Sequence, residues 1–450
     1  MKPQITLDPK TSKPVLAKLS RQNAAYLARF PGDFAGRQPV HTVYGGAHLF
    51  KSDSAAKLGE LSVRALSRYG PDAITFARAV GMDEALAHKV YDRVVEKLKR
   101  EAVEDFRIDF EDGYGNRSDA EEDGHAVGAA LEVARGLEEG TLPPFLGIRV
   151  KTFSNELAGR SSRTMDIFLT TLIRQTKGRL PEWFCVTLPK IVHPGQAAAL
   201  AKLLDAFEKK KKLKANTIKV ELMVETTQSI IGADGTAPLR AMVDALGGRI
   251  TGAHFGTYDY TASCNITAAH QHMMHASCDF AKSVMQVTLA GTGVTMSDGA
   301  TNVMPVGPHR PAPGAYLSAE QDRENVDAVR RAWKLHYDHA THSLVNGFYQ
   351  GWDLHPAQLP TRYAAVYAFF IAGLPQATAR LKNFIEKAAQ ATLVGDVFDD
   401  AATGQGLLNY FLRARNCGAI TAEEAAATGL TPEEFASRSF LKILEGRRKA

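Results

Sequence analysis

Residues 219–260 hold two short apolar segments, each followed by a carboxylate, with a helix-length insert between them. The first segment, KVELMV, is followed directly by Glu225, and the second, ITGAHF, is followed by Asp259 a few residues later. The insert, roughly residues 238–246, predicts a helix, so the stretch indicates a βαβ unit whose strands are parallel neighbours. Glu225 and Asp259 are therefore expected at the same edge of one sheet.

This pair of carboxylates predicts a metal site. Mg²⁺ and Mn²⁺ are hard cations that take oxygen ligands and leave coordination positions for substrate, which suits two acids at the C-terminal ends of parallel strands. We therefore expect Glu225 and Asp259 to bind one divalent cation. The alternative is two separate surface acids at strand ends, and this segment by itself leaves both interpretations open.

The composition restricts the class of protein. A chain of 450 residues is long enough for one large α/β domain with an appendage, or for two ordinary domains. The net charge of +5 is small for this length, so no nucleic-acid partner is expected. Four scattered cysteines without CxxC spacing favour a reducing compartment and argue against a structural zinc site.

Targeting and membrane signals are weak. The N-terminal residues lack the apolar core of a secretory signal, and the longest apolar run, around residues 363–374, is too short to span a bilayer. We therefore expect a soluble cytoplasmic protein without membrane contact. We also expect this protein to assemble as a homo-oligomer.

Strand-like and helix-like segments alternate along most of the chain. Eight such alternations are typical of a closed parallel (β/α)8 TIM barrel in the α/β class, whose functional residues lie at the C-terminal strand ends. A doubly wound sheet is the competing architecture, but no GxGxxG motif follows the first strand. The strands are expected within residues 41–50, 106–110, 145–150, 184–191, 219–224, 250–255, 293–300 and 351–358.

The alternation predicts three parts. Residues 1–37 form an N-terminal lead with one helical piece at 13–30. Residues 38–375 form the catalytic barrel, and residues 376–450 form a C-terminal helical appendage, serving as a lid over the barrel mouth or as an oligomerisation segment. After residue 355 the pattern is typical of helices only, through residue 390 and again from residue 406 onward.

Arg149, in GIRVK, lies at a predicted strand exit. A guanidinium group there can hold a carboxylate through two parallel hydrogen bonds, which fits a 2-oxo acid or dicarboxylic acid substrate. The alternative is an ion pair with the acidic cluster Asp109, Glu111 and Asp112. Alternation along that segment directs Asp109 and Glu111 to one side, where they could hold metal-bound water or orient Arg149. A solvated strand end is the other interpretation of these acids.

Lys190 and His355 follow two further predicted strands. Lys190 could form a Schiff base with a carbonyl substrate, but an ion pair with the same acids is the preferred interpretation. Two sets of histidines are interpreted as helix positions and not as metal ligands, the second set as a partly exposed stripe. These histidines are residues 270, 272 and 275, and residues 336, 339 and 342.

Six short motifs occur in an order that resembles one enzyme family. They are DFEDG at 109–113, the arginine of GIRVK, LPK at 188–190, VET at 224–226, GTYDYT at 256–261 and LHPAQ at 354–358. Together they resemble the citrate lyase β-subunit and HpcH/HpaI-type aldolase family, with malate synthase as a more distant relative. The match covers roughly residues 40–360 and implies a phosphoenolpyruvate/pyruvate-type barrel.

The resemblance also implies roles for individual residues. Glu225 and Asp259 would be the Mg²⁺ ligands and Arg149 the clamp for the substrate carboxylate. The acids of the DFEDG motif would act beside Arg149 in catalysis. Substrate contacts are expected from Arg149, Gly256, Thr257, Lys190 and His355.

A further segment, DDAATGQ at 399–405, is similar to the EDAATAE element of malate synthases, whose aspartate serves as the catalytic base. Asp400 falls on that position. Two departures from the pattern leave a CoA thioester substrate open: GQ replaces AE, and the insert between the first two strands is long for lyase subunits. The alternative is that Asp399 and Asp400 cap the following helix.

The leading interpretation is an Mg²⁺-dependent carbon–carbon lyase or aldolase that acts on a 2-oxo acid or a 3-hydroxy acid. The first alternative is a malate-synthase-like condensation of an acyl-CoA with a 2-oxo acid, with Asp400 as the base. An alternative of another class is a catalytically silent barrel that serves as a subunit or scaffold. The intact set of Arg149, Glu225 and Asp259 argues against that last interpretation.

Overall fold

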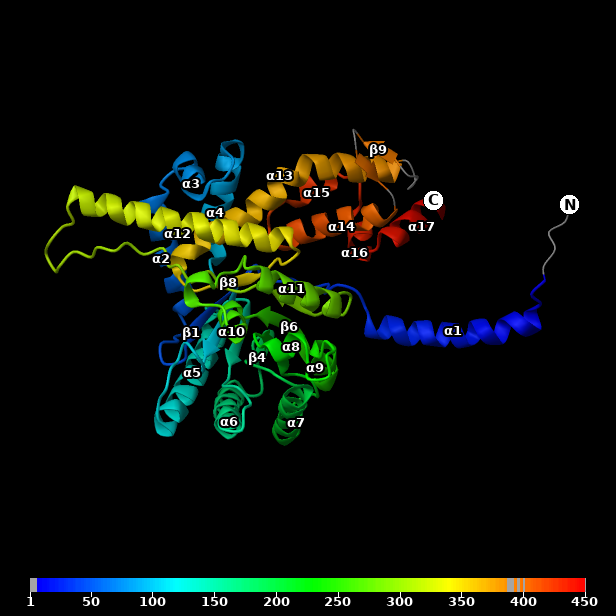
Figure 1. Ribbon diagram of the computed structural model, residues 1–450, viewed down its shortest axis with the longest axis horizontal. Helices are drawn as coiled ribbons and strands as arrows, with labels where there is room; N and C mark the ends of the chain where they lie inside the picture. The colour runs from blue at the N-terminus through cyan, green and yellow to red at the C-terminus, as the bar shows by residue number, and fades with distance from the viewer. Residues whose placement is uncertain (1–5, 387–391, 395–396, 400, 450) are drawn as a thin grey trace.

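The computed structural model describes residues 6–386, 392–394, 397–399 and 401–449. Its centre is a nearly closed barrel of eight parallel strands surrounded by helices, so the predicted TIM barrel is confirmed (Figure 1). The strands are β1 His41–Gly46, β2 Asp105–Asp109, β3 Phe145–Arg149, β4 Trp183–Leu188, β5 Lys219–Val224, β6 Ile250–Phe255, β7 Thr295–Ser297 and β8 Gly351–Asp353.

From β1 to β7 each strand pairs with the next one along the chain, and β8 pairs with β1. The barrel closes through the residues that follow β7, because Ala300 forms a parallel bridge with Trp352. The Trp352 N–H also donates to the Gly299 carbonyl oxygen at 3.0 Å. The predicted βαβ unit is present, with Val224 of β5 opposite Phe255 of β6.

Helices cover the outside of the barrel, and polar residues at their first turns fix where several of them begin. Ser118 and Ser318 each form a capping box, in which the serine hydroxyl and a side chain three residues later satisfy backbone N–H groups. The helices between β1 and β8 are α2 Ser54–Tyr69, α3 Ala73–Val80, α4 Ala87–Glu101, α5 Asp119–Glu139, α6 Ala158–Gln175, α7 Pro194–Lys211, α8 Thr227–Ile230, α9 Leu239–Ala245, α10 Thr257–Ser263, α11 Ala276–Leu289 and α12 Ala319–Val345, with 3-10 turns at Glu84–Leu86 and Ala268–His270.

The interpretation of histidines 270, 272 and 275 as positions of a helix is wrong, because no α-helix covers residues 267–275. Asn265 has a left-handed backbone with φ of 59°, which ends the α10 region, and a separate helix, α11, begins only at Ala276. His275 caps α11, because its Nδ1 accepts the Ser277 N–H at 3.1 Å. The histidines of this region therefore do not share one helix.

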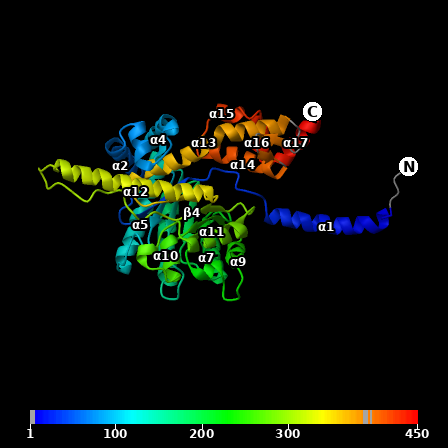
Figure 2. The same cartoon turned by 45° about the horizontal axis from the view of Figure 1, so that its top comes forward.

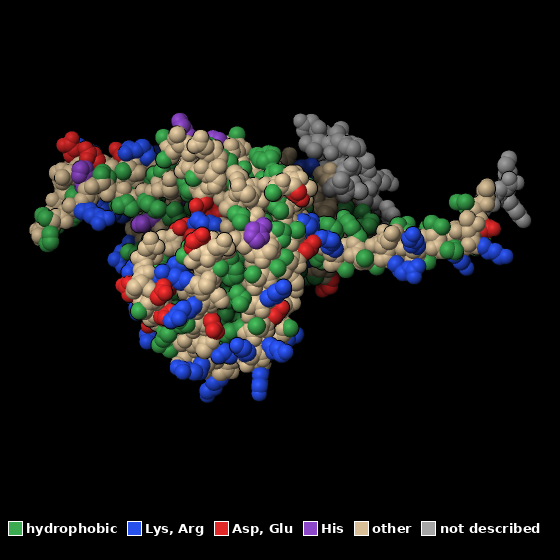
Figure 3. Space-filling model, turned by 60° about the horizontal axis from the view of Figure 1, so that its bottom comes forward, with side chains coloured by type: hydrophobic (Ala, Val, Ile, Leu, Met, Phe, Trp, Pro, Cys, Tyr) green, Lys and Arg blue, Asp and Glu red, His purple; other side chains and the backbone are tan. Residues whose placement is uncertain are grey.

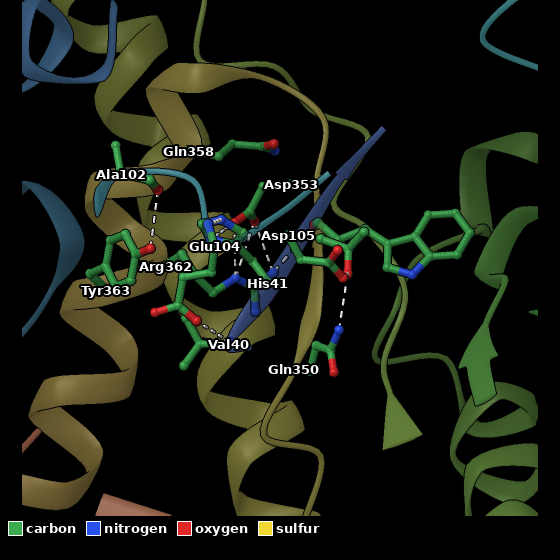
Figure 4. A network of polar contacts seen from close by, with 12 residues as sticks. Val40, His41, Ala102, Glu104, Asp105, Gln350, Asp353, Gln358, Arg362 and Tyr363 are labelled. Atoms are coloured by element: carbon green, nitrogen blue, oxygen red, sulfur yellow. Dashed lines mark hydrogen bonds and ion pairs between the residues drawn. The ribbon is translucent and has the colours of Figure 1, made fainter. Parts of the chain in front are cut away.

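The second set of histidines is more buried than the predicted stripe. His336 and His339 are buried, and only His342 is partly exposed, because α12 packs between the barrel and α13 (Leu359–Glu386). His336 Nε2 lies 2.9 Å from Asp353 Oδ1, in a buried network that also contains His41 and Arg362 (Figure 4). This network joins α12 and α13 to β1 and β8.

The C-terminal appendage packs on α13. It consists of α14 Ala401–Asn416, α15 Ala422–Ala426, α16 Pro432–Ser437 and α17 Phe440–Lys449, and a short antiparallel pair, β9 Thr392–Val394 and β10 Val397–Asp399, precedes them. This pair lies between the two stretches expected to be helical, which run through residue 390 and again from residue 406 onward. The predicted boundary at residue 375 falls inside α13, which is continuous there. The division into parts and the lid role stay predictions.

The described contacts show which end of the barrel the appendage meets. Asn416 accepts the Gln38 N–H at 3.0 Å, and Arg413 donates to the Gln38 side chain at 2.6 Å. Gln38 immediately precedes β1, so α14 contacts the barrel at the end where the strands begin. The carboxylate-rich strand ends lie at the opposite face.

The N-terminal helix α1, Pro9–Arg29, projects away from the rest of the molecule in two views (Figures 1 and 2). Its base is held at the body, where the Gly32 N–H donates to the Gly291 carbonyl oxygen at 2.9 Å. Among the described residues, no helix has both the length and the apolar character needed to cross a lipid bilayer.

Candidate functional site

Charged side chains gather at the C-terminal ends of five adjacent strands. β2 ends at Asp109, β3 ends at Arg149, Lys190 follows β4, and Glu225 follows β5. Asp259 lies in the first turn of α10, just after β6. Because all these strands are parallel neighbours, residues far apart in the sequence meet at one edge of the sheet. The structure therefore brings the predicted carboxylates and cations together.

Arg149 and Asp109 form a buried, two-pronged ion pair. Arg149 Nε donates to Asp109 Oδ1 at 2.7 Å, and Arg149 Nη2 donates to Asp109 Oδ2 at 2.5 Å. Asp109 also accepts the backbone N–H groups of Glu111 and Gly113, which fixes the turn after β2. Burial opposes the charged form of Arg149, but the carboxylates of Asp109 and Glu111 keep the pKa of Arg149 well above its usual value.

This pair limits how Arg149 can bind a substrate. The predicted ion pair with the acidic cluster is present, and it occupies the Nε and Nη2 edge of the guanidinium group. Nη1 lies 3.4 Å from Glu111 Oε2 and 3.9 Å from Asp112 Oδ2, beside the Met223 sulfur. A substrate carboxylate would therefore have to approach the Nη1 side.

Lys190 links carboxylates that follow two strands, β2 and β6. Its Nζ lies 2.5 Å from Glu111, 2.9 Å from Asp112 and 3.5 Å from Asp259, so the predicted ion pair is confirmed. Burial lowers the pKa of the Lys190 ammonium, but Glu225 and Glu111 raise it more, so that the pKa lies above its usual value. Lys190 has a left-handed backbone with φ of 50°, a strained conformation that non-glycine residues adopt mostly at functional sites and tight turns.

Glu225 is buried beside this cluster. Its side chain is 1% exposed, and its Oε1 accepts the Lys190 backbone N–H at 2.7 Å. Burial raises the pKa of Glu225 to about 8, the positive charge of Lys190 opposes this shift, and the negative charge of Asp259 adds to it. The carboxyl group is therefore held in a place where a proton or another cation would stabilise it.

The missing side chain of Gly256 leaves room for the Glu225 carboxylate. A Cβ atom added at Gly256 would lie 2.4 Å from Glu225 Oε2, so no larger residue fits without a shift. The adjacent Thr257 hydroxyl is buried and has no hydrogen-bond partner in the described part of the chain. Both residues were predicted to contact substrate, and Gly256 lies against the metal-ligand candidate Glu225.

The other predicted residues contribute less to this geometry. His355 Nδ1 accepts the Ala357 N–H at 3.1 Å, which caps a short 3-10 turn, Pro356–Gln358. Burial lowers the pKa of His355. Asp400 lies outside the described residues.

A polar layer inside the barrel, beneath the carboxylates, was missed by the sequence interpretation. The Arg149 guanidinium lies 4.8 Å from the centre of the Tyr44 ring, and the Tyr44 hydroxyl is 3.3 Å from His254 Nδ1. His254 Nε2 is 2.8 Å from Glu221, which also accepts a hydrogen bond from Arg107 Nη2 at 2.7 Å. Polar residues at alternate positions of otherwise apolar strands are the signal that could have predicted this layer.

The residues present suit a hard divalent cation in an open site better than a metal ion enclosed by protein ligands alone. In the described ranges, no group of three or more His, Cys, Asp or Glu side chains is arranged to hold a metal ion. Glu225 and Asp259 would therefore supply two oxygen ligands and leave the remaining positions to water or substrate, as Mg²⁺ prefers. The cluster holds five carboxylates and two cations, and the space beside Gly256 adjoins the buried carboxylate.

Several solved structures are similar to this chain at low sequence identity. A citrate lyase from Burkholderia xenovorans LB400 has a TM-score of 0.57 and 18% identity, covering 87% of this chain and 97% of that chain. CitE from Mycobacterium tuberculosis, in complex with magnesium, acetoacetate and coenzyme A, has a TM-score of 0.47 and 14% identity, with coverage of 85% and 98%. Malate synthase from Haloferax volcanii, in complex with magnesium and glyoxylate, has a TM-score of 0.46 and 13% identity, with coverage of 93% and 99%.

At this identity the citrate lyase similarity establishes the fold and no more. Comparison with curated proteins gives no match. The model of one protein family, described as "Domain of unknown function (DUF6986)", matches residues 19–443. Since that match covers almost the entire chain, the protein belongs to the DUF6986 family.

Proposed function

We propose that this protein is a divalent-cation-dependent enzyme that makes or breaks a carbon–carbon bond in a 2-oxo acid or a 3-hydroxy acid. One observation carries the proposal: five carboxylates surround two cations at the barrel mouth, and Glu225, which is almost fully buried, packs against the backbone of Gly256. The sequence motifs that resemble citrate lyase β-subunits support the same reaction class.

In this proposal Glu225 and Asp259 hold Mg²⁺ or Mn²⁺. When bound, the cation supplies a Lewis acid for the oxygen on which negative charge develops. Arg149 binds the substrate carboxylate through Nη1, because Asp109 already occupies its Nε and Nη2 edge. Asp109 thereby orients Arg149, and the fixed guanidinium group positions the substrate.

Lys190 and the DFEDG acids have positioning roles. The Lys190 backbone N–H directs Glu225 Oε1, while its ammonium group holds Glu111 and Asp112. Two ion-paired acids beside Arg149 also restrict its Nη1 group to one orientation. The buried Thr257 hydroxyl, which has no partner in the described chain, is available to a substrate oxygen.

The charge of the site implies an order of binding. At neutral pH Glu225 holds a proton, so the other four carboxylates exceed the two cations by two charges, and an anionic oxo acid is repelled from the empty cluster. A divalent cation reduces this excess, and it also replaces the proton that Glu225 holds near neutral pH. We therefore expect oxo-acid binding to require the cation.

The second candidate is the condensation of a CoA thioester with a 2-oxo acid. The observation that favours it is the DDAATGQ segment at 399–405, with Asp400 as the base. A non-catalytic scaffold is disfavoured by the buried charges, because burying ionised side chains costs stability that a scaffold has no reason to retain.

Calorimetry can test the proposal directly. Pyruvate, glyoxylate and oxaloacetate are titrated into the protein in Mg²⁺ and, separately, in EDTA, and deuterium exchange at C3 of pyruvate is followed by NMR. The expected result is oxo-acid binding and exchange in Mg²⁺ only. Glu225→Gln should abolish Mg²⁺ binding, and Asp338→Asn, at an exposed ion pair of α12, is the matched control.

Two results would contradict the proposal. The first is equal oxo-acid affinity in Mg²⁺ and in EDTA. The second is Mg²⁺ affinity that stays unchanged in both Glu225→Gln and Asp259→Asn. To separate the two candidate functions, the same protein is incubated with acetyl-CoA and glyoxylate, and release of free CoA thiol would favour condensation.

A further inference from the structure

The apolar face of the N-terminal helix α1 has no partner within the described part of one copy. None of the helix residues is buried, and the contact at its base is polar, an ion pair between Arg29 and Asp244. Several of its large apolar residues are widely exposed, with Leu16 at 59%, Tyr26 at 61% and Leu27 at 64%. Both ribbon views show the helix extending away from the body (Figures 1 and 2).

Apolar and basic residues occupy opposite faces of α1. The large apolar residues share one face at helical spacing and form a stripe, which we call the α1 stripe: Val15, Leu16, Leu19, Tyr26 and Leu27, with Asn23 as a polar residue between them. The basic residues lie on the other face and are Lys10, Lys13, Lys18, Arg21 and Arg29. Figure 3 shows green and blue side chains along the whole helix.

An isolated helix with this exposed stripe needs a covering surface. Helices gain most of their stability in proteins by packing an amphipathic face, and a single helix of this length is marginal in water. The family match begins at residue 19, so the second half of α1 belongs to the same family domain as the barrel. We therefore infer that the surface that covers α1 belongs to the same protein.

A second unpartnered apolar surface lies beside the base of α1. It consists of Phe280 and Val287 on α11 and Val345 at the end of α12, with exposed fractions of 55%, 83% and 69%, and we call it the α11 patch. Gln286 donates to the Asn346 carbonyl oxygen, which joins the two helix ends.

The α11 patch is connected to α1 through Arg240. Its guanidinium group donates to the Thr288 carbonyl oxygen at the end of α11 and lies 4.7 Å from the centre of the Phe30 ring. The base of α1 and the end of α11 therefore lie close together in one subunit, and α1 itself points away from the patch (Figure 1).

We propose that α1 of one copy packs its α1 stripe against the α11 patch of a second copy, and that the two copies exchange their helices about a two-fold axis. A two-fold contact uses the same two surfaces on both copies, which covers both unpartnered surfaces at once. The occupant of each patch is thus the α1 stripe of the partner.

The size of α1 is sufficient for such a dimer. A helix of 21 residues is about 31 Å long and about 10 Å wide, so one face presents roughly 500 Å². Each copy contributes one helix face and one receiving patch, so its buried area is the roughly 500 Å² of the helix face together with the exposed area of the patch. A stable interface typically buries about 800 Å² per partner.

The charge of α1 makes an anionic lipid surface the competing partner. Residues 1–30 contain six lysines or arginines and one aspartate, so they carry +5, the net charge of the whole chain. Basic amphipathic helices bind anionic membranes through both faces. A lipid surface would leave the α11 patch uncovered, however, and pairing with a second copy covers it.

Sedimentation equilibrium of the full chain tests the proposal with two matched double variants. Leu16→Glu/Leu19→Glu places two negative charges on the α1 stripe, and Ala17→Glu/Ala28→Glu places two on the basic face. The expected result is a dimer for the wild type and for Ala17→Glu/Ala28→Glu. The stripe variant should sediment as a monomer with unchanged melting of the barrel.

The receiving surface is tested by Val287→Glu, an exposed position that folding does not depend on. It should also give a monomer, and a Val287→Glu dimer would overturn the assignment of the α11 patch. Co-sedimentation with vesicles of phosphatidylglycerol and of phosphatidylcholine tests whether α1 binds an anionic lipid surface. A monomeric wild type that pellets only with phosphatidylglycerol, and loses this in Ala17→Glu/Ala28→Glu, would overturn the proposal.

Discussion

The backbone N–H of Lys190 donates to Glu225 Oε1 at 2.7 Å, while the Lys190 side chain turns to Glu111 and Asp112. One residue in a left-handed conformation thus positions the buried carboxylate with its main chain and neutralises two other acids with its side chain. The two roles can be separated, because a substitution at Lys190 removes the ammonium group and keeps the N–H group.

Lys190→Met should shift the pH dependence of metal binding upwards. Burial raises the pKa of Glu225 to about 8 and the Lys190 charge opposes that shift, so loss of the charge raises this pKa further. Mg²⁺ must displace the Glu225 proton, and the midpoint of Mg²⁺ affinity against pH should therefore move to higher pH. Calorimetry between pH 6 and pH 10 measures the midpoint, with Lys190→Arg as the charge-preserving control. An unchanged midpoint in Lys190→Met would contradict the coupling.

The stability of the metal-free protein should fall as the pH rises through the titration of Glu225. The folded pKa of about 8 lies above the ordinary value of 4.5, so between these values the folded state holds a proton that the unfolded chain has released. The free energy of unfolding then decreases with pH over this window. Glu225→Gln should flatten this part of the profile, measured by urea unfolding in EDTA. The idea fails if wild type and Glu225→Gln give parallel profiles.

Gly256→Ala should damage the site through size alone. The backbone at Gly256, with φ of −100° and ψ of 93°, is accessible to alanine, but the new Cβ would lie 2.4 Å from Glu225 Oε2. We expect a loss of about 1–3 kcal/mol in the free energy of unfolding, typical of overpacking, and a loss of Mg²⁺ binding.

The control for this prediction is Gly124→Ala in α5, where an added Cβ meets no atom within 4 Å. Replacing a glycine inside a helix by alanine should stabilise the protein by about 0.5–1 kcal/mol. Retention of full Mg²⁺ affinity in Gly256→Ala would show that the space beside Glu225 is not used by the cation.

The positions of the acids were predictable, whereas their partners were not. Alternation of strands and helices places Glu225 and Asp259 at one edge, because parallel strands end together. That Asp109 takes two donors of Arg149 depends on side-chain rotamers and on the turn at Gly113, which no sequence pattern encodes.

Two other sets of contacts were not predicted because they depend on tertiary packing. Glu221 and His254 were interpreted as parts of apolar strands, but in a closed barrel alternate residues point inwards and can pair across it. His336 resembles an exposed helix position until α13 packs over α12 and Asp353 becomes its partner. Local periodicity does not contain either contact.

Asp109→Asn should destabilise the protein strongly, because it leaves the buried Arg149 guanidinium without its charged partner. Removing one partner of a buried ion pair lowers the free energy of unfolding by about 3–5 kcal/mol. Asp112→Asn is the matched control, since the Asp112 side chain is 58% exposed and a surface change should stay within about 0.5 kcal/mol. Urea unfolding at pH 7 measures both. Similar losses for the two variants would mean that Arg149 does not depend on Asp109.

Asp400 can be tested as a base without reference to its placement. If Asp400 is a general base, its loss should reduce turnover by roughly 10²–10⁴-fold while Mg²⁺ and oxo-acid binding persist. If Asp400 is instead a helix cap before α14, its loss should cost about 1 kcal/mol of stability and leave turnover largely intact. Asp400→Asn is therefore assayed for deuterium exchange at the substrate carbon, for binding and for thermal unfolding. Normal exchange with a lower melting temperature would assign Asp400 to capping.

The described contacts of α14 lie at the strand-start end, opposite the carboxylates, so a base at Asp400 is best tested across two copies. Asp400→Asn and Glu225→Gln, each inactive alone in the base hypothesis, are mixed after dissociation and reassembly. If Asp400 serves the site of a partner, a mixed dimer holds one site with both an intact Glu225 and an intact Asp400, and activity should return. If Asp400 serves its own barrel, each site in the mixed dimer lacks one of the two groups, and the mixture stays inactive.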